Sequence, residues 1–225
     1  NWATPSDPVY NEDGSWNRKF IRKANDRNPK LSAEYDYKHE KMLRAFNTLY
    51  AEYEIIKNLK FKTTFSYDYT TVKGEKWYDP RTSNGEDENG EEVKRIREYK
   101  KMVWSNTLSY LTTFNNIHHL DFLAGYEIDD TYNDYLSGEA YNFTTPDKHA
   151  ISNGMKTVSV GGSDSRYRLV SYLSRLNYDY KNKYYLGASF RVDGSSRLHR
   201  DNRWGTFWSV SGAWRTIEEE FMQPV

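Results

Sequence analysis

LKFKTTFSYDYT, residues Leu59–Thr70, alternates strictly between two kinds of side chain. The odd-numbered positions carry leucine, threonine and aromatic residues, whereas the even-numbered positions include Lys60, Lys62 and Asp68. Successive side chains of a β-strand point to opposite faces, so this period of two predicts a strand with one apolar and one polar face. A lysine facing lipid at the bilayer midplane costs about 2–4 kcal/mol. In a membrane barrel the aromatic face would therefore point to lipid, and Lys60, Lys62 and Asp68 would face the lumen.

The same alternation recurs and predicts seven strands. They cover Leu43–Ile55, Leu59–Thr70, Tyr99–Thr113, Leu120–Ile128, Arg166–Tyr180, Tyr184–Val192 and Trp204–Arg215. The short connections fall near Ile56–Asn58, Phe114–His118 and Lys181–Lys183, and the longer ones at Thr71–Glu98, Ser137–Ser165 and Asp193–Arg203. Short turns at one end and long loops at the other are typical of an outer-membrane barrel. The predicted fold class is all-β: about seven strands of a larger antiparallel transmembrane β-barrel with long extracellular loops.

One alternative produces the same alternation. A soluble antiparallel β-protein with a single packed face also has a period of two, so a secreted β-rich glycan-binding module stays open at this point. The asymmetry of the connections favours the barrel. So does the placement of tyrosines near the predicted strand ends, because aromatic residues form girdles at both membrane interfaces.

The composition excludes several other classes. Among the 225 residues, 32 basic side chains balance 32 acidic ones, so no excess charge points to nucleic acid. The absence of cysteine excludes disulfide scaffolds, zinc–thiolate sites and thiol nucleophiles. No apolar run reaches the roughly 20 residues of a transmembrane helix, whereas a barrel strand needs only about 9–11 residues. The 20 tyrosines and 7 tryptophans suit interfacial girdles.

The candidate functional residues are polar residues of the strands and aromatic residues of the long connections. On the lumen side of the later strands we expect Arg175, Asp179, Arg191 and Asp193. They form either a polar wall of paired charges or a contact to a plug or a substrate path. In the external loops we expect Trp77, Tyr78, Tyr141 and Phe143. Stacking on a sugar or peptide and packing against other loops or a lid protein are both open for these four.

The sequence contains no catalytic or metal-binding constellation. His118 and His119 are neighbours in a short turn, where we expect them to be solvated; in a strand they would point opposite ways. The acidic cluster Glu86–Glu92 lacks the ligand order of an EF-hand and reads as a solvated loop. There is no G-x-S-x-G elbow and no glycine loop for phosphate. We therefore expect no catalytic residue, no metal and no cofactor, and a protein that is not an enzyme.

Two later stretches are more specific than the alternation. Residues 168–198 read RLVSYLSRLNYDYKNKYYLGASFRVDGSSRL, and residues 203–222 read RWGTFWSVSGAWRTIEEEFM. In order they contain a tight Lys-Asn-Lys turn, a strand ending in Arg-x-Asp-Gly-Ser-Ser-Arg, and a Ser-x-Ser-x-x-Trp-Arg strand followed by Glu-Glu-x-Phe. Together they resemble the barrel of SusC/RagA-type TonB-dependent outer-membrane transporters. Leu111–Glu127 and Asn58–Tyr69 resemble earlier hairpins of that barrel, and Leu198 departs from it where an aromatic residue is common.

The resemblance implies a location, a function and partners. It implies a wall segment of a large plugged transporter in the outer membrane of a Gram-negative bacterium, in contact with outer-membrane lipid. It implies import of oligosaccharides or peptides powered through TonB, which an N-terminal part outside this sequence would contact. It also implies a SusD-like surface lipoprotein as a lid. We expect residues 1–42 to form an external loop region, 43–215 the strands and loops, and 216–225 the start of the next turn. The plug domain and TonB box are expected outside the 225 residues.

Overall fold

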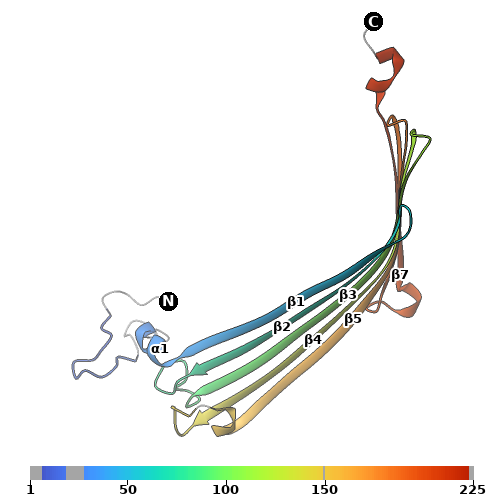
Figure 1. Ribbon diagram of the computed structural model, residues 1–225. Helices are drawn as coiled ribbons and strands as arrows, with labels where there is room; N and C mark the ends of the chain where they lie inside the picture. Colours follow the sequence, from blue (N-terminus) through green and yellow to red (C-terminus); the bar gives the residue numbers. More distant parts are fainter. Residues whose placement is uncertain (1–6, 19–27, 149, 223–225) are drawn as a thin grey trace. The chain divides into compact units, whose positions relative to one another are not determined.

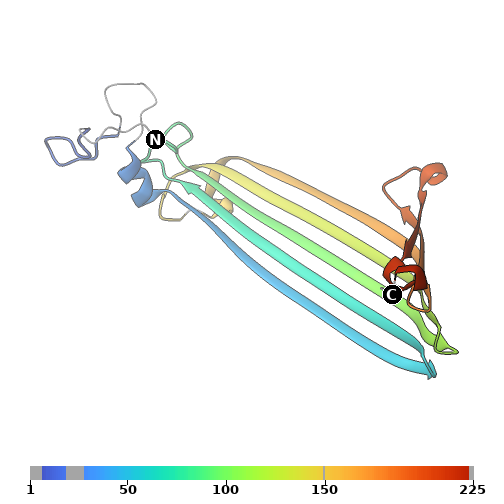
Figure 2. The ribbon, with the colours of Figure 1, turned by 90° about the horizontal axis from the view of Figure 1, so that it is seen from above.

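The computed structural model describes residues 7–18, 28–148 and 150–222 of the chain. Within these residues, seven strands lie side by side in chain order (Figure 1). They are β1 (Tyr37–Ile56), β2 (Leu59–Tyr78), β3 (Glu91–Phe114), β4 (His118–Phe143), β5 (Gly154–Tyr180), β6 (Tyr184–Ser195) and β7 (Trp204–Trp214). Each strand pairs with the next one in sequence, so each connection is a hairpin, as Figure 2 shows from above. The sheet is not closed, and β1 and β7 are its outer strands. The predicted all-β antiparallel fold, with seven strands of a larger barrel, is confirmed.

The three short turns are built on left-handed backbone. Asn115 and Asn116 have φ of 51° and 57°, and Lys181 and Asn182 have φ of 57° and 53°. A two-residue type I′ hairpin turn needs positive φ at both central positions, and asparagine adopts it at the least cost among residues with a side chain. Asn58, with φ of 69°, ends the first short turn. The short connections predicted from the sequence are confirmed at all three places.

The long connections are much shorter than the sequence pattern predicted. Only residues 79–90 join β2 to β3, and only residues 144–153 join β4 to β5. The prediction of loops over Thr71–Glu98 and Ser137–Ser165 is therefore wrong for most of their length. Polar side chains occur on both faces of the strands there, so the hydrophobic alternation fades although the strands continue.

Charged pairs between neighbouring strands replace apolar contacts in these extensions. Lys76 of β2 lies 2.5 Å from Glu91 of β3, and Lys94 of β3 lies 2.9 Å from Glu75 of β2. Opposite charges across a strand pair contribute roughly 0.2–1 kcal/mol each. A hydrophobicity pattern does not reveal such pairs, because their residues look like ordinary loop residues.

The N-terminal region also has more regular structure than the predicted external loop. Helix α1 (Pro29–Tyr35) is capped by Asn28, whose Oδ1 accepts the backbone N–H groups of Lys30 and Leu31 at 3.1 and 3.2 Å. β1 begins only two residues after α1 ends. The loop prediction is thus wrong for residues 29–42, and its residues 1–6 and 19–27 lie outside the described part. No helix among the described residues is long and apolar enough to cross a membrane.

The last stretch, predicted to start the next turn, holds two 3-10 turns at Thr216–Glu218 and Glu220–Met222. Glu219 lies between them and accepts hydrogen bonds from Tyr184 Oη at 2.5 Å and Trp214 Nε1 at 3.1 Å. These bonds hold the segment against the end of the β6–β7 hairpin. The role of residues 216–225 as the start of a next turn stays a prediction, and residues 223–225 lie outside the described part.

The chain divides into two compact units. Unit 1 comprises Asn1–Arg44, Thr70–Glu98 and Asn133–Asp164, and unit 2 comprises Ala45–Tyr69, Tyr99–Tyr132 and Ser165–Val225. The division follows a change along the strands. On one face of β3, β4 and β5 the last apolar residues are Met102, Ile128 and Val170. Two positions further along each strand, towards the segments of unit 1, the same face carries charged residues instead: Lys100, Asp130 and Arg168. Unit 2 therefore carries the apolar part of the strands.

One face of unit 2 is apolar and exposed. In the β6–β7 register Phe190 lies opposite Trp208 and Ala188 opposite Val210, so these residues share a face. Trp208 is 75% exposed and Val210 is 65% exposed. Soluble proteins rarely expose a continuous apolar surface of this kind, which marks contact with another apolar phase or partner.

Two rows of rings bound this apolar face. The row beside the short turns joins His118, Tyr180, Tyr184 and Trp214, with ring centroids 5.0, 6.3 and 6.2 Å apart. The other row joins Tyr126, Tyr172 and Trp204 at 5.1 and 6.2 Å.

The separation of the two rows fits a bilayer. On β7, Trp204 and Trp214 stand at the two rows, and the paired β6 residues are Gly194 and Tyr184. Trp214 is ten positions after Trp204, and ten steps of about 3.4 Å each span roughly 34 Å. At a barrel tilt of about 40° this is roughly 26 Å along the membrane normal, which matches an apolar band of about 25 Å.

Unit 1 has a small core of its own. Trp77 and Phe143 are each 2% exposed and pack edge to face, with ring centroids 4.9 Å apart. Ala140 completes the cluster, and Tyr37 and Ile151 pack against it. The core thus ties the ends of β2 and β4 to the start of β1 and to the 144–153 connection.

Candidate functional site

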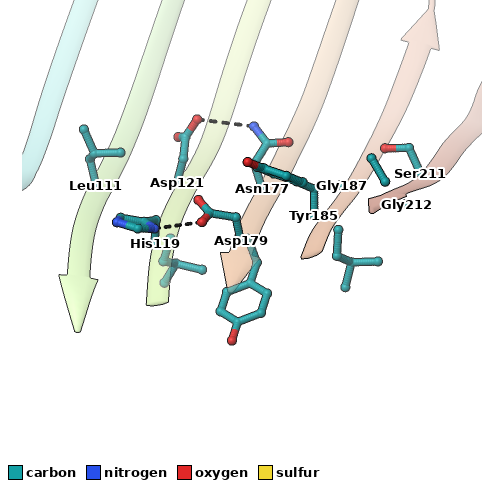
Figure 3. Close-up of a pocket in the computed structure, with 13 residues that line it drawn as sticks. Leu111, His119, Asp121, Asn177, Asp179, Tyr185, Gly187, Ser211 and Gly212 are labelled. Carbon is teal, nitrogen blue, oxygen red and sulfur yellow. Dashed lines mark hydrogen bonds and ion pairs between the residues drawn. The ribbon is translucent and has the colours of Figure 1, made fainter. Parts of the chain in front are cut away.

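The face of unit 2 opposite the apolar one is polar, and beside the short turns it is hollowed (Figure 3). His119 Nδ1 lies 2.8 Å from Asp179 Oδ1, so the imidazole donates to the carboxylate. Asp121 Oδ2 accepts from Asn177 Nδ2 at 3.3 Å and from Arg175 Nη2 at 3.4 Å. These contacts join β4 to β5 in one network along the wall of the hollow.

Small residues of β6 and β7 create the hollow. Gly187 lies opposite Ser211 in the register, and a Cβ at Gly187 would meet Ser211 Oγ at 2.6 Å. Gly212 and Ala213 follow on β7 and also line the space, whose volume is about 380 Å³. Tyr185 closes one side and donates from its hydroxyl to the carbonyl of Asn182 at 2.6 Å. The floor is thus backbone and short side chains, while the rim carries hydrogen-bonding groups.

This network presents polar groups that already hold neighbouring strands together. Each acidic oxygen of the rim described above already holds a neighbouring strand, and Asp179 Oδ1 also accepts the backbone N–H of Asn182 at 3.1 Å. Nucleophilic catalysis needs a nucleophile in hydrogen-bond contact with a base that a third group orients. Within the described residues no group of three or more histidine and acidic side chains is placed to hold a metal ion.

The structure gives the predicted lumen-facing residues two further clusters. Arg191 pairs with Asp193 at 2.8 Å and donates to Ser171 Oγ at 3.1 Å. Ser171 lies opposite Asp193 in the register, so this cluster occupies the same polar face as Asp179.

The third cluster is on the first hairpin. Lys60 lies 3.5 Å from Glu52, and the Lys62 ammonium lies 5.0 Å from the Tyr50 ring centroid. Asp68 belongs to the same even-numbered face of β2. The seven predicted residues are therefore distributed along the polar face in several clusters and do not form one site.

The four candidate aromatic residues are not in loops, contrary to the sequence prediction. Trp77 and Tyr78 end β2, and Tyr141 and Phe143 end β4. Trp77 and Phe143 pack on each other in the core of unit 1, so their faces are not available for stacking on a solute. Tyr78 and Tyr141 remain partly exposed, and substrate contact stays a prediction for them.

Two acidic residues of the cluster Glu86–Glu92 pair with lysines of neighbouring strands. Glu88 lies 2.6 Å from Lys156, and Glu91 pairs with Lys76. Carboxylates neutralised in this way do not converge on a common cation. The cluster Glu86–Glu92, which the sequence predicted to be a solvated loop, therefore contributes in part to ion pairs with neighbouring strands.

One carboxyl of unit 1 lies in an unusual environment. The Glu92 side chain is fully buried, with Lys94 Nζ 3.7 Å away, while Glu75 takes the shorter 2.9 Å contact with Lys94 and a hydrogen bond from Tyr37 Oη at 3.0 Å. Burial, with the neighbouring Glu75 as a further cause, raises the pKa of Glu92 to about 8. The hydrogen bond from Lys94 holds the pKa of Glu75 below its ordinary value. At neutral pH Glu92 is thus mainly protonated.

Sequence reasoning missed several of these contacts. His118 and His119 begin β4 and are not solvated turn residues, which corrects the prediction. His118 Nδ1 lies 2.7 Å from Tyr178 Oη on the apolar face, whereas His119 contacts Asp179 on the polar face. Their opposite orientations match the expectation for neighbours in a strand. Both partners are 60 residues away in sequence. One feature of the sequence could have indicated that the histidines belong to the strand. Both directly precede the stretch of alternating apolar and polar residues that begins at Leu120.

Comparison with known proteins matches this architecture. No family model matches the chain. TonB-dependent receptor P39 of Formosa agariphila is 28% identical over 225 residues, which cover 99% of this chain and 21% of the receptor. TonB-dependent receptor SusC of Bacteroides thetaiotaomicron is 38% identical over 93 residues, 41% of this chain and 9% of SusC. A solved structure of the RagAB peptide transporter superposes with a TM-score of 0.83 at 21% identity, covering 95% of this chain.

The resemblance to SusC/RagA-type TonB-dependent transporters is confirmed. The matches run through nearly the whole chain, and the open sheet corresponds to part of a barrel. The chain spans about a fifth of the length of the receptors it matches and 24% of the RagAB chain. The matched relatives are named as receptors and as a transporter, not as enzymes.

Proposed function

We propose that this chain forms part of the barrel wall of a TonB-dependent importer in the outer membrane of a Gram-negative bacterium. The observation that carries the proposal is the exposed apolar face of unit 2 between two rows of aromatic rings. An apolar face in water would be destabilising, whereas in a bilayer it replaces lipid–lipid contact. A soluble glycan-binding module would need a second layer over this face, whereas the described strands form a single sheet.

The polar face then lines the lumen. Lys60, Lys62, Arg175 and Arg191 would each be expensive against lipid and are each placed on that face next to a polar partner. The 380 Å³ hollow near the short turns lies, on this proposal, at the periplasmic end of the lumen. A plug domain in contact with the wall would meet His119, Asp121 and Asp179 there.

Unit 1 would lie on the external side, because the connections 79–90 and 144–153 belong to it and the three short turns to unit 2. The strands there carry polar side chains on both faces, which fits water. This is where a SusD-like lipoprotein lid would dock. Tyr78 and Tyr141 are the candidates for contact with substrate.

The substrate class is either peptide or oligosaccharide. The matched RagAB structure is named a peptide transporter, which favours peptides for that fold without fixing the substrate of this chain. The hydrogen-bonding groups and partly exposed tyrosines are compatible with either solute, because aromatic faces stack on sugars and peptides alike.

Two experiments test the proposal with the full-length protein. Cells are fractionated and the membranes extracted with and without detergent, followed by a gel with and without boiling. We expect outer-membrane residence, release only by detergent and a folded form with altered migration. Release without detergent would refute the barrel and support the soluble module.

Uptake is then measured in a gene deletion and in a strain lacking TonB, with labelled peptides and labelled oligosaccharides in parallel. Loss of uptake of one class in both strains identifies the substrate. Undiminished uptake of both classes in the deletion strain would refute the importer proposal.

A further inference from the structure

Three arginines gather at the border of the apolar face of unit 2. Arg166 and Arg168 are on β5, and Arg203 precedes β7. Together with Tyr167 and Ser196 they line an open groove of about 410 Å³. None of these residues belongs to the polar network beside the short turns.

A single carboxylate orients two of the arginines. Asp130 accepts Nε and Nη2 of Arg166 at 2.9 and 2.7 Å, and Nε and Nη2 of Arg168 at 3.1 and 2.6 Å. Asp130 is only 7% exposed, whereas the arginine side chains are 61% and 52% exposed. Each guanidinium therefore uses one edge on Asp130 and presents its remaining N–H groups to the outside.

The groove keeps an excess of positive charge. The hydrogen bond from Arg166, followed by that from Arg168, lowers the pKa of Asp130 to about 2, so this carboxylate is ionised at any physiological pH. Three guanidinium groups against one carboxylate leave a net charge of about +2.

Two donors in the groove lack a complete set of partners. Arg203 Nε is shielded from solvent and has no hydrogen-bond acceptor within the described residues. A buried donor without an acceptor is destabilising, and an anion in the groove would offset this cost. Ser196 Oγ accepts the backbone N–H of Arg168 at 2.8 Å and keeps its own proton to donate.

The position of the groove points to lipid and not to solute. Arg168 is the next same-face residue after Val170 on β5, and Trp204 of the outer aromatic row directly follows Arg203. Asp130 follows Ile128 on β4 in the same way. Arg166 and Arg168 thus stand on the lipid side of the wall, at the depth where a headgroup begins, and Arg203 joins them in the lining of the groove.

We propose that this arginine groove binds a phosphate group of an outer-leaflet glycolipid. The proposal rests on the outer-membrane placement given above but not on any transported substrate. Arginine suits phosphate because its planar donors form bidentate, charge-assisted bonds. The acyl chains of such a lipid would lie along the apolar face beside Tyr172 and Trp204.

The test uses the full-length protein in detergent, with three probes: phosphorylated lipid A, the same lipid A after enzymatic removal of phosphate, and inorganic phosphate. The variant Arg166→Gln/Arg168→Gln/Arg203→Gln removes the charges of the groove. Arg200→Gln is the matched control. Like Arg203, Arg200 is an arginine in the connection between β6 and β7, but it does not line the groove. Altered gel migration without boiling verifies that each variant is folded.

We expect the wild type to bind phosphorylated lipid A at least about tenfold more tightly than the dephosphorylated form, since one charge-assisted bond is worth about 1.5–3 kcal/mol. The triple variant should lose this preference and Arg200→Gln should keep it. Equal binding of both lipids by the wild type, or an unchanged preference in the triple variant, would overturn the proposal. Inorganic phosphate binding as tightly as the lipid would assign the groove to a free anion and overturn the lipid assignment.

A triple variant that does not fold is replaced by the single variant Arg203→Gln, for which a smaller but measurable loss of preference is expected. Failure of the lipid proposal is distinguishable from failure of the importer proposal, because cell fractionation and uptake do not depend on this groove.

Discussion

Replacing Trp77 with alanine tests whether unit 1 is held by its own core or whether Trp77 instead serves the substrate. Trp77 is 2% exposed, and its ring packs edge to face on Phe143. A buried tryptophan removes about 150–250 Å² from water, which is worth roughly 4–6 kcal/mol at about 25 cal/mol per Å². Measured truncations of buried tryptophan to alanine cost about 3–5 kcal/mol, and we expect a loss in that range here.

The loss should appear as local opening of unit 1. A change of about 3–5 kcal/mol raises the open population by roughly two to nearly four orders of magnitude. The assay is the rate of limited proteolysis within residues 79–90 in outer membranes that contain the full-length protein. Trp77→Phe keeps an aromatic ring against Phe143 and removes the hydrogen bond of 3.4 Å to Asp79, so it should be cleaved at a rate much closer to the wild type. Tyr78→Ala, at a partly exposed neighbour, is the matched control.

The reasoning is refuted if Trp77→Ala is cleaved at the wild-type rate. Loss of uptake with unchanged proteolysis would instead restore the substrate-stacking role that the sequence suggested. The altered migration of the unboiled barrel should persist in all three variants, because Trp77 lies in unit 1 and not in the apolar part of the strands.

Three further predictions concern separate features. The pKa of Glu92 is raised from 4.5 to about 8 in the folded state. Between these two pH values the folded state holds a proton that the unfolded state has released. The contribution of Glu92 to the free energy of unfolding is therefore greatest at low pH and is lost as pH rises through 8. Proteolysis of unit 1 should therefore accelerate between pH 6 and 9 in the wild type but not in Glu92→Gln, and parallel profiles would contradict this. Val210→Arg places a charge on the apolar face and should cost about 2–4 kcal/mol in urea titrations of the folded barrel, whereas Ser209→Arg on the polar face should cost far less; equal costs would reverse the assignment of faces. Lys181→Asn should stabilise the β5–β6 turn by up to about 1 kcal/mol in the same titration, because Lys181 has φ of 57° and asparagine adopts that conformation more readily; a loss of stability would show that the lysine side chain matters more than its backbone.

The alternating part of the fold was readable from the sequence because its information is local. In Leu59–Thr70 and Tyr184–Val192, an apolar face and a polar face impose a period of two that survives in the residues themselves. The tight turns at Asn115 and Lys181 leave local signals of the same kind. The polar-face assignment of Arg175, Asp179, Arg191 and Asp193 follows from that period alone.

The extended strands and their contacts were decided only by the tertiary structure. Residues 71–78 and 91–98 have polar side chains on both faces, so no hydrophobic period marks them as strand, and the pairing Lys76–Glu91 is visible only once β2 and β3 are aligned. Trp77 meets Phe143, and His119 meets Asp179, across about 60 or more residues of sequence. Such contacts depend on strand register, which is set by the whole ladder of backbone hydrogen bonds and not by either residue. The same register brings Asp130 to the arginines of β5, which no motif in the sequence announces.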